Sequence, residues 1–63
     1  MRTLSYFIEA SADFDLAYNS IVEQIPCFAS WKPFGEDGEY IEVYFACREE
    51  DAAFVEKMLA PFV

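Results

Sequence analysis

The sequence predicts an α+β fold, a two-layer β-α-β-β-α sandwich whose three-stranded sheet has the order 1-3-2 and carries both helices on one face. Three observations predict it. The hydrophobic period changes from two to helical spacing, two β-rich runs then flank a glycine-containing turn, and helical spacing returns at the end. The 63 residues form one domain, residues 1–63, because a chain of this length builds a single core. An apolar fraction of 56% is high enough to fill that core.

The first strand is expected over residues 3–10, where Leu4 and Ile8 belong to a run of alternate residues that share one face. From Ser11 onward the apolar residues recur at helical spacing. Ser11 is a suitable N-cap, and two aspartates follow in the first turn, where the helix dipole favours acids. The first helix therefore begins after Ser11 and ends at Pro26.

Two β-rich runs, residues 27–34 and 39–48, are separated by the sequence GEDG and predict a hairpin. If Gly35 faces Glu39 across the loop, the register follows by counting. The expected partners are Cys27 with Cys47, Ala29 with Phe45, Trp31 with Val43, Lys32 with Glu42, and Pro33 with Ile41. In this register Trp31 packs inward and Lys32 faces solvent, whereas a slip of one residue would turn Lys32 toward the core.

The second helix is expected over residues 49–63, which open with three acids and carry apolar residues on one side up to Pro61. A strand, a crossover helix and a second strand of one sheet normally join parallel and right-handed. The first two strands are therefore expected to be parallel, with the third strand between them. This order puts Pro33 on an edge strand, where a missing N–H is tolerated.

Twelve Asp and Glu against four Lys and Arg give a formal charge of -8, which repels nucleic-acid phosphates and anionic lipids. The expected partner is a basic protein surface, with no direct binding to nucleic acid or membrane. The first ten residues lack the apolar run of a signal peptide, so a cytoplasmic location is expected. There Cys27 and Cys47 are expected to stay reduced and buried.

Catalysis is not expected. The chain has no His to serve as a base for Ser or Cys, and it lacks a glycine-rich phosphate loop. Two Cys without His give no zinc-ligand spacing, and the short run Asp13 to Asp15 has too few oxygens for a calcium loop. The sequence therefore predicts a non-enzymatic protein without a cofactor or metal site.

Half of the acids are expected at one end of the molecule, because the end of the first strand, the start of the first helix and the hairpin loop meet there. We call this set the acidic pole: Glu9, Asp13, Asp15, Glu36, Asp37 and Glu39. Glu42 lies close by on the sheet. A second acidic cluster, Glu49, Glu50 and Asp51, begins the second helix at the opposite end. Both sets have an alternative explanation, since acids are common in solvated turns and in the first turns of helices.

The sheet face turned away from the helices is expected to be aromatic. We call it the open sheet face; its expected aromatic residues are Phe7, Phe28, Phe34, Tyr40 and Tyr44, beside Ser5, Ser30 and Ala46. RNA-binding sheets stack bases on such aromatics, but they have basic rims, whereas this face carries Glu9 and Glu42. The face is either a protein-binding surface, a homodimer interface, or covered by the chain itself.

In size, charge and aromatic content the chain resembles the small acidic inhibitors encoded by phages and mobile elements, including anti-CRISPR proteins and other DNA mimics. The resemblance is at the level of the class, without a shared motif. It implies an inhibitor that occupies the basic nucleic-acid-binding groove of a larger protein complex. Its contacts would come from the acidic pole with Phe34, Tyr40, Glu42 and Tyr44, and from the second acidic cluster. The alternative is a structural or regulatory module, monomeric or homodimeric, that binds through the open sheet face.

Overall fold

The computed structural model describes all residues, Met1–Val63. Its elements are β1 (Arg2–Glu9), α1 (Ala12–Gln24), β2 (Cys27–Phe34), β3 (Tyr40–Cys47), a 3-10 turn (Glu49–Asp51), α2 (Ala52–Leu59) and a second 3-10 turn (Ala60–Phe62). The expected order β-α-β-β-α is confirmed. The predicted second helix is divided into three pieces, because Pro61 cannot continue the hydrogen-bond ladder of α2 and the acids before α2 form a tighter turn.

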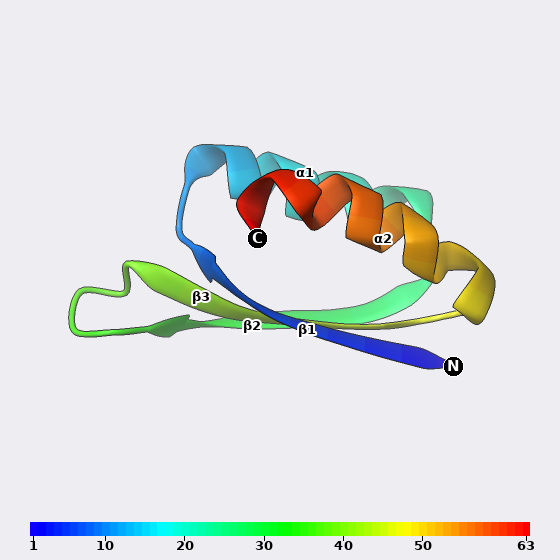
Figure 1. Cartoon of the computed structure of the whole chain (residues 1–63), viewed down its shortest axis with the longest axis horizontal. Coiled ribbons are helices and arrows are strands. Elements are labelled where there is room, and N and C mark those ends of the chain that lie inside the picture. The colour runs from blue at the N-terminus through cyan, green and yellow to red at the C-terminus, as the bar shows by residue number, and fades with distance from the viewer.

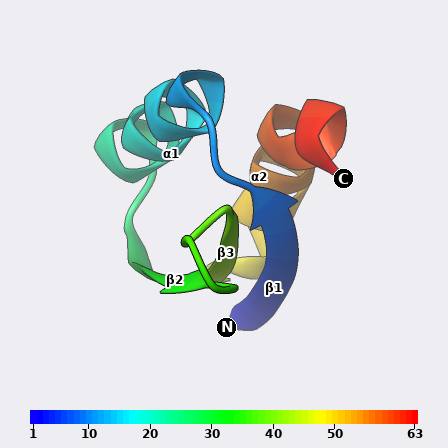
Figure 2. The same cartoon turned by 90° about the vertical axis from the view of Figure 1, so that its left-hand side faces the viewer.

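The sheet has the order β1-β3-β2, and β3 is antiparallel to both of its neighbours. Figure 2 shows β3 between the two outer strands. β1 and β2 are therefore parallel to each other, as the crossover rule predicts. The predicted hairpin register is confirmed, including Cys27 with Cys47, Trp31 with Val43 and Lys32 with Glu42.

Both helices lie on the same face of the sheet, and the opposite face is bare (Figure 1). The Ser11 hydroxyl caps α1 by accepting a hydrogen bond from the Phe14 N–H at 3.0 Å. The buried side of α1 consists of Phe14, Ala17 and Ile21. Neither helix is both long enough and apolar enough to span a membrane.

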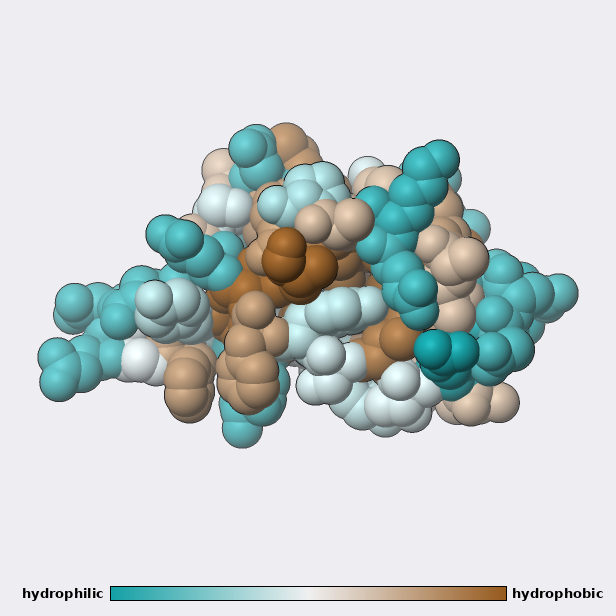
Figure 3. All heavy atoms as spheres, viewed as in Figure 1, coloured by the Kyte–Doolittle hydropathy of each residue, from teal (hydrophilic) through white to brown (hydrophobic).

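The core fills the space between the helices and the sheet, where brown residues gather in Figure 3. Its largest fully buried side chains are Phe14, Phe45, Ile8, Ile21, Leu59, Val43, Val55 and Cys47. No buried side-chain nitrogen or oxygen lacks a hydrogen-bond partner. No polar or charged residue is buried, so hydrophobic burial is what stabilises this small fold.

The expectation that Trp31 packs into the core is wrong, although its register is right. Trp31 is 52% exposed, while its neighbour Val43 on the central strand is fully buried. The reason is incomplete coverage: an open hollow, lined by Trp31, Ser11 and Asp15, lies between the start of α1 and the hairpin. Alternation along a strand determines which side of the sheet a residue faces, but not what covers that side.

Cys27 and Cys47 are opposite each other on the helix-facing side of the hairpin, and both are free thiols. Cys47 is buried and Cys27 is half-buried. Burial raises the pKa of both thiols above the ordinary value of 9.0, and at Cys27 the neighbouring Cys47 raises the pKa further. Both side chains therefore remain protonated and weakly nucleophilic at neutral pH.

Candidate functional site

The acidic pole forms because the end of β1 is tied to the hairpin loop. The Ala10 N–H donates a hydrogen bond to the Glu39 carbonyl oxygen at 2.8 Å, and Glu9 is the strand partner of Tyr40. α1 begins directly after this junction, so Asp13 enters the same region in its first turn. Two segments distant in sequence, residues 9–15 and residues 36–39, thus bring their acids to one end of the molecule.

Two glycines determine the shape of the loop that carries the other acids. Gly35 and Gly38 have positive φ angles of 96° and 67°, a region that favours glycine. The Asp37 N–H donates to a Glu39 carboxylate oxygen at 3.3 Å. The side chain of Glu39 is therefore turned back over the loop, while Glu36 and Asp37 are exposed.

None of the six carboxylates of the acidic pole forms an ion pair. The ion pairs of the protein join Arg2 to Glu49 and Glu56, Arg48 to Glu50 and Asp51, and Lys32 to Glu42. Both arginines thus lie at the end of the molecule away from the pole, and the nearest cation, Lys32, is held by Glu42. In Figure 3 hydrophilic residues gather at both ends of the long axis, but only one end carries its compensating charge.

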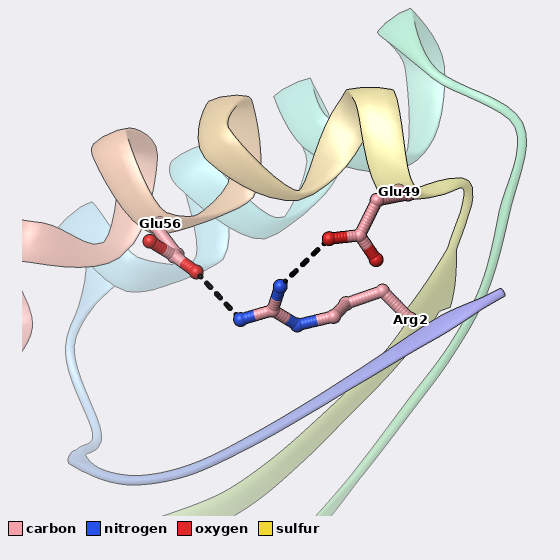
Figure 4. A network of polar contacts seen from close by, with 3 residues as sticks. All are labelled: Arg2, Glu49 and Glu56. Carbon is pink, nitrogen blue, oxygen red and sulfur yellow. Dashed lines mark hydrogen bonds and ion pairs between the residues drawn. The ribbon is translucent and has the colours of Figure 1, made fainter.

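Each carboxylate of the second acidic cluster forms an ion pair with one of these arginines. The Arg2 guanidinium extends from β1 between Glu49 and Glu56, at 2.9 Å and 3.6 Å (Figure 4). Arg48 contacts Asp51 at 2.9 Å, and this hydrogen bond together with the negative charge of Asp51 raises the Arg48 pKa. The second acidic cluster is therefore explained by its place at the start of α2 and by its ion pairs. The acidic pole has no ion pairs, so the two ends of the molecule differ in how their acids are compensated.

A hollow of about 410 Å³ separates the start of α1 from the hairpin, on the helix-facing side of the sheet. It is lined by Ala10, Ser11, Asp15, Trp31, Pro33, Gly38 and Ile41. An exposed indole beside an unpaired carboxylate is suited to a cationic side chain, because the ring face and the carboxylate both attract positive charge. The sequence analysis did not identify Trp31 as a surface residue. The length of the strands could have indicated its exposure, because the strands are longer than the part of the sheet that the helices can cover.

The aromatic residues of the open sheet face are not covered by the rest of the chain; of the expected members of this face only Ala46 is buried, at 6% exposed. Its five aromatic side chains are between 42% exposed, at Tyr44, and 79% exposed, at Phe28. The rings of Phe7 and Phe34 contact each other with centroids 5.5 Å apart. Lys32 and Glu42 form the ion pair at 3.4 Å that the register predicts, near the middle of this face.

The predicted partner-binding residues thus fall into three places. The acidic pole is assembled as expected, and Phe34 and Tyr40 adjoin it as strand partners at the loop end of the hairpin. Glu42 and Tyr44 lie further along the open sheet face. The second acidic cluster is remote from both. No three acidic or thiol side chains come together in a way that would hold a metal ion.

Comparisons with protein-family models, with curated proteins and with solved structures give no match to this chain. Function is therefore inferred from the geometry and charge of the acidic pole, the hollow beside it and the open sheet face.

Proposed function

We propose that the protein is a non-enzymatic acidic inhibitor that docks its acidic pole into a basic, nucleic-acid-binding groove of a larger protein, in the manner of anti-CRISPR proteins and other DNA mimics. One observation carries this proposal: six carboxylates at one end have no cationic partner, whereas the second acidic cluster is matched by Arg2 and Arg48. The groove supplies the missing positive charge.

The physical advantage lies in association. An uncompensated cluster of like charge produces a field that steers a basic partner into contact and raises the association rate by about 10- to 1000-fold at low salt. Within the free protein the same cluster is mildly destabilising, since neighbouring carboxylates repel one another. The two glycines allow the positive φ angles of the loop, and the hydrogen bond from the Asp37 N–H to the Glu39 carboxylate joins two of its acids.

The hollow beside the pole gives the partner a second type of contact. A Lys or Arg side chain from the rim of the groove can lie against the Trp31 ring with its charge near Asp15. Such a cation–π contact contributes about 0.5–1 kcal/mol when exposed and about 2 kcal/mol when water is excluded. The pole then provides long-range attraction, and Trp31 provides a short-range contact that depends on shape.

Several further properties of the sequence and the structure support this assignment. The charge of -8 disfavours direct binding to nucleic acid, and the chain contains no histidine for general base catalysis. Two free thiols with raised pKa values are compatible with the reducing cytoplasm, where nucleic-acid-binding complexes are abundant. We therefore place the protein and its partner there.

Capture of partners from a cell lysate tests the proposal. The variant Glu36→Gln/Asp37→Asn/Glu39→Gln removes half of the pole charge, and Glu23→Gln/Glu49→Gln/Glu50→Gln removes the same charge elsewhere. In this control Arg2 keeps Glu56 and Arg48 keeps Asp51.

The wild type and the control should retain the same basic nucleic-acid-binding protein, and added DNA or RNA should release it. The pole variant should retain much less. Equal capture by all three proteins, or a captured partner that nucleic acid does not displace, would contradict the proposal.

A further inference from the structure

The open sheet face is large enough to be an interface. At about 150–250 Å² per aromatic side chain, the exposed fractions of its five aromatics correspond to roughly 550 Å² per copy. Two such faces in contact would bury about 1,100 Å², which exceeds the roughly 1,000 Å² expected of a specific interface. A second copy of the chain is therefore an occupant of sufficient size.

The strand register arranges the open sheet face in four rows that run across β1, β3 and β2. The rows are Thr3, Ala46 and Phe28; Ser5, Tyr44 and Ser30; Phe7, Glu42 and Lys32; and Glu9, Tyr40 and Phe34. Two copies can stack these faces about a two-fold axis in the interface plane that runs either along the strands or across them. The two axes bring different residues together.

An axis along the strands is unfavourable. It keeps each row on the same row of the other copy, so Glu42 of one copy would face Glu42 of the other. Two carboxylates brought together in this way repel each other and lose hydration, and each has only Lys32 of its own copy, at 3.4 Å, beside it. The same axis sets Ala46 against Ala46 and Ser5 against Ser30, which leaves gaps where small residues meet.

An axis across the strands matches the two faces instead. It stacks the first row on the fourth row and the second row on the third row of the other copy. The facing pairs are Phe28 with Phe34, Ala46 with Tyr40, Thr3 with Glu9, Ser5 with Phe7, Tyr44 with Glu42, and Ser30 with Lys32. Small residues then meet large ones, and each charged side chain faces a hydroxyl group that can form a hydrogen bond with it.

The charge of the molecule favours the same axis. The acidic pole lies at the loop end of the sheet, so an axis along the strands would set two poles side by side. An axis across the strands places them at opposite ends of the long dimension of the protein, which is 35 Å for one copy. That separation is several times the Debye length of about 8 Å at physiological salt, so the repulsion between the poles is largely screened.

We propose that the protein is a two-fold symmetric homodimer in which the open sheet faces pack together with the strands of the two copies antiparallel. The dimer leaves both Trp31 hollows and five of the six carboxylates of each acidic pole outside the interface, one set at each end, and only Glu9 of each pole faces the other copy. This inference does not depend on the proposed function, because the dimer is tested without a partner.

Sedimentation velocity over a range of protein concentrations tests the dimer. The wild type should have twice the mass of the chain. Phe28→Ala should weaken the dimer at least about tenfold, because the lost ring area lies in the interface. Leu16→Ala is the matched control: Leu16 is also an exposed apolar residue, at 67%, but it lies on α1 outside the face.

The orientation is tested by changing Ser30, which faces Lys32 of the other copy only if the strands are antiparallel. Ser30→Glu should tighten the dimer or leave it unchanged, and Ser30→Lys should weaken it. Net charge alone predicts the reverse order, because Ser30→Lys reduces the overall repulsion between copies of charge -8.

A monomer at every concentration, or equal weakening by Phe28→Ala and Leu16→Ala, would overturn the dimer. A dimer tightened by Ser30→Lys would overturn the antiparallel arrangement. The pole variant Glu36→Gln/Asp37→Asn/Glu39→Gln should still dimerise, so failure of the proposed function and failure of the dimer are distinguishable.

Discussion

Replacing Trp31 with alanine separates the two roles that a large aromatic residue can have on this hairpin. A fully buried Trp or Phe replaced by Ala costs about 3–5 kcal/mol. Trp31 is 52% exposed, so roughly 100 Å² of its surface is buried. At about 25 cal/mol per Å², and after subtraction of the buried surface that Ala retains, the free energy of unfolding should fall by at most about 2 kcal/mol. We expect a loss of about 1–2 kcal/mol and a protein that still folds.

Urea unfolding followed by circular dichroism measures this loss, with Phe45→Ala as the matched comparison. Phe45 is fully buried under Tyr18, with ring centroids 5.6 Å apart. Its replacement should cost about 3–5 kcal/mol, close to the whole stability of a domain this small. A Trp31→Ala loss as large as that of Phe45→Ala would refute the inference that the loop end of the hairpin is uncovered. The hollow beside Asp15 would then have no exposed indole to offer a partner.

The remaining predictions concern the loop and the pH dependence of stability. Gly35→Ala should destabilise the protein by about 1–2 kcal/mol in urea unfolding, because φ is 96° and the new Cβ would lie 3.1 Å from a Glu39 carboxylate oxygen. Gly38→Ala, at a φ of 67°, should destabilise it less. Equal losses of stability in the two variants would contradict this account of the turn. Burial raises the pKa of four groups: Cys27, Cys47, Tyr6 and Tyr18. The unfolded chain then releases protons first as the pH rises, so the free energy of unfolding should fall from about pH 9 upward. A titration that shows constant or rising stability between about pH 9 and pH 11 would contradict the burial of these groups.

The sequence was sufficient for the fold because several independent signals agreed. The change of period, the Ser11 cap and the GEDG loop each located an element boundary, and the pairing of Lys32 with Glu42 distinguished one register from its neighbours. The position of the acidic pole followed from that topology, since connectivity alone brings the ends of three elements together.

Coverage and long-range ion pairs could not be predicted in the same way. Whether Trp31 is buried depends on how far the helices reach over the hairpin, which is a property of packing rather than of strand alternation. The contact of Arg48 with Asp51 is local, three residues apart, and could have been expected from spacing. The contacts of Arg2 with Glu49 and Glu56 depend on the pairing of β1 with β3, and the difference between the two acidic ends depends on them.

The most direct test of the acidic pole is the rate at which the protein associates with its captured partner, measured by stopped flow at low and high salt. For the wild type and for Glu23→Gln/Glu49→Gln/Glu50→Gln the rate should be high at low salt and should fall steeply as salt is added. For Glu36→Gln/Asp37→Asn/Glu39→Gln it should be lower by about tenfold at low salt, and the difference should shrink at high salt, where the charges of the wild type are screened. Equal rates and equal salt dependence for the pole variant and the control would show that the acidic pole is only a solvated turn beside a helix start.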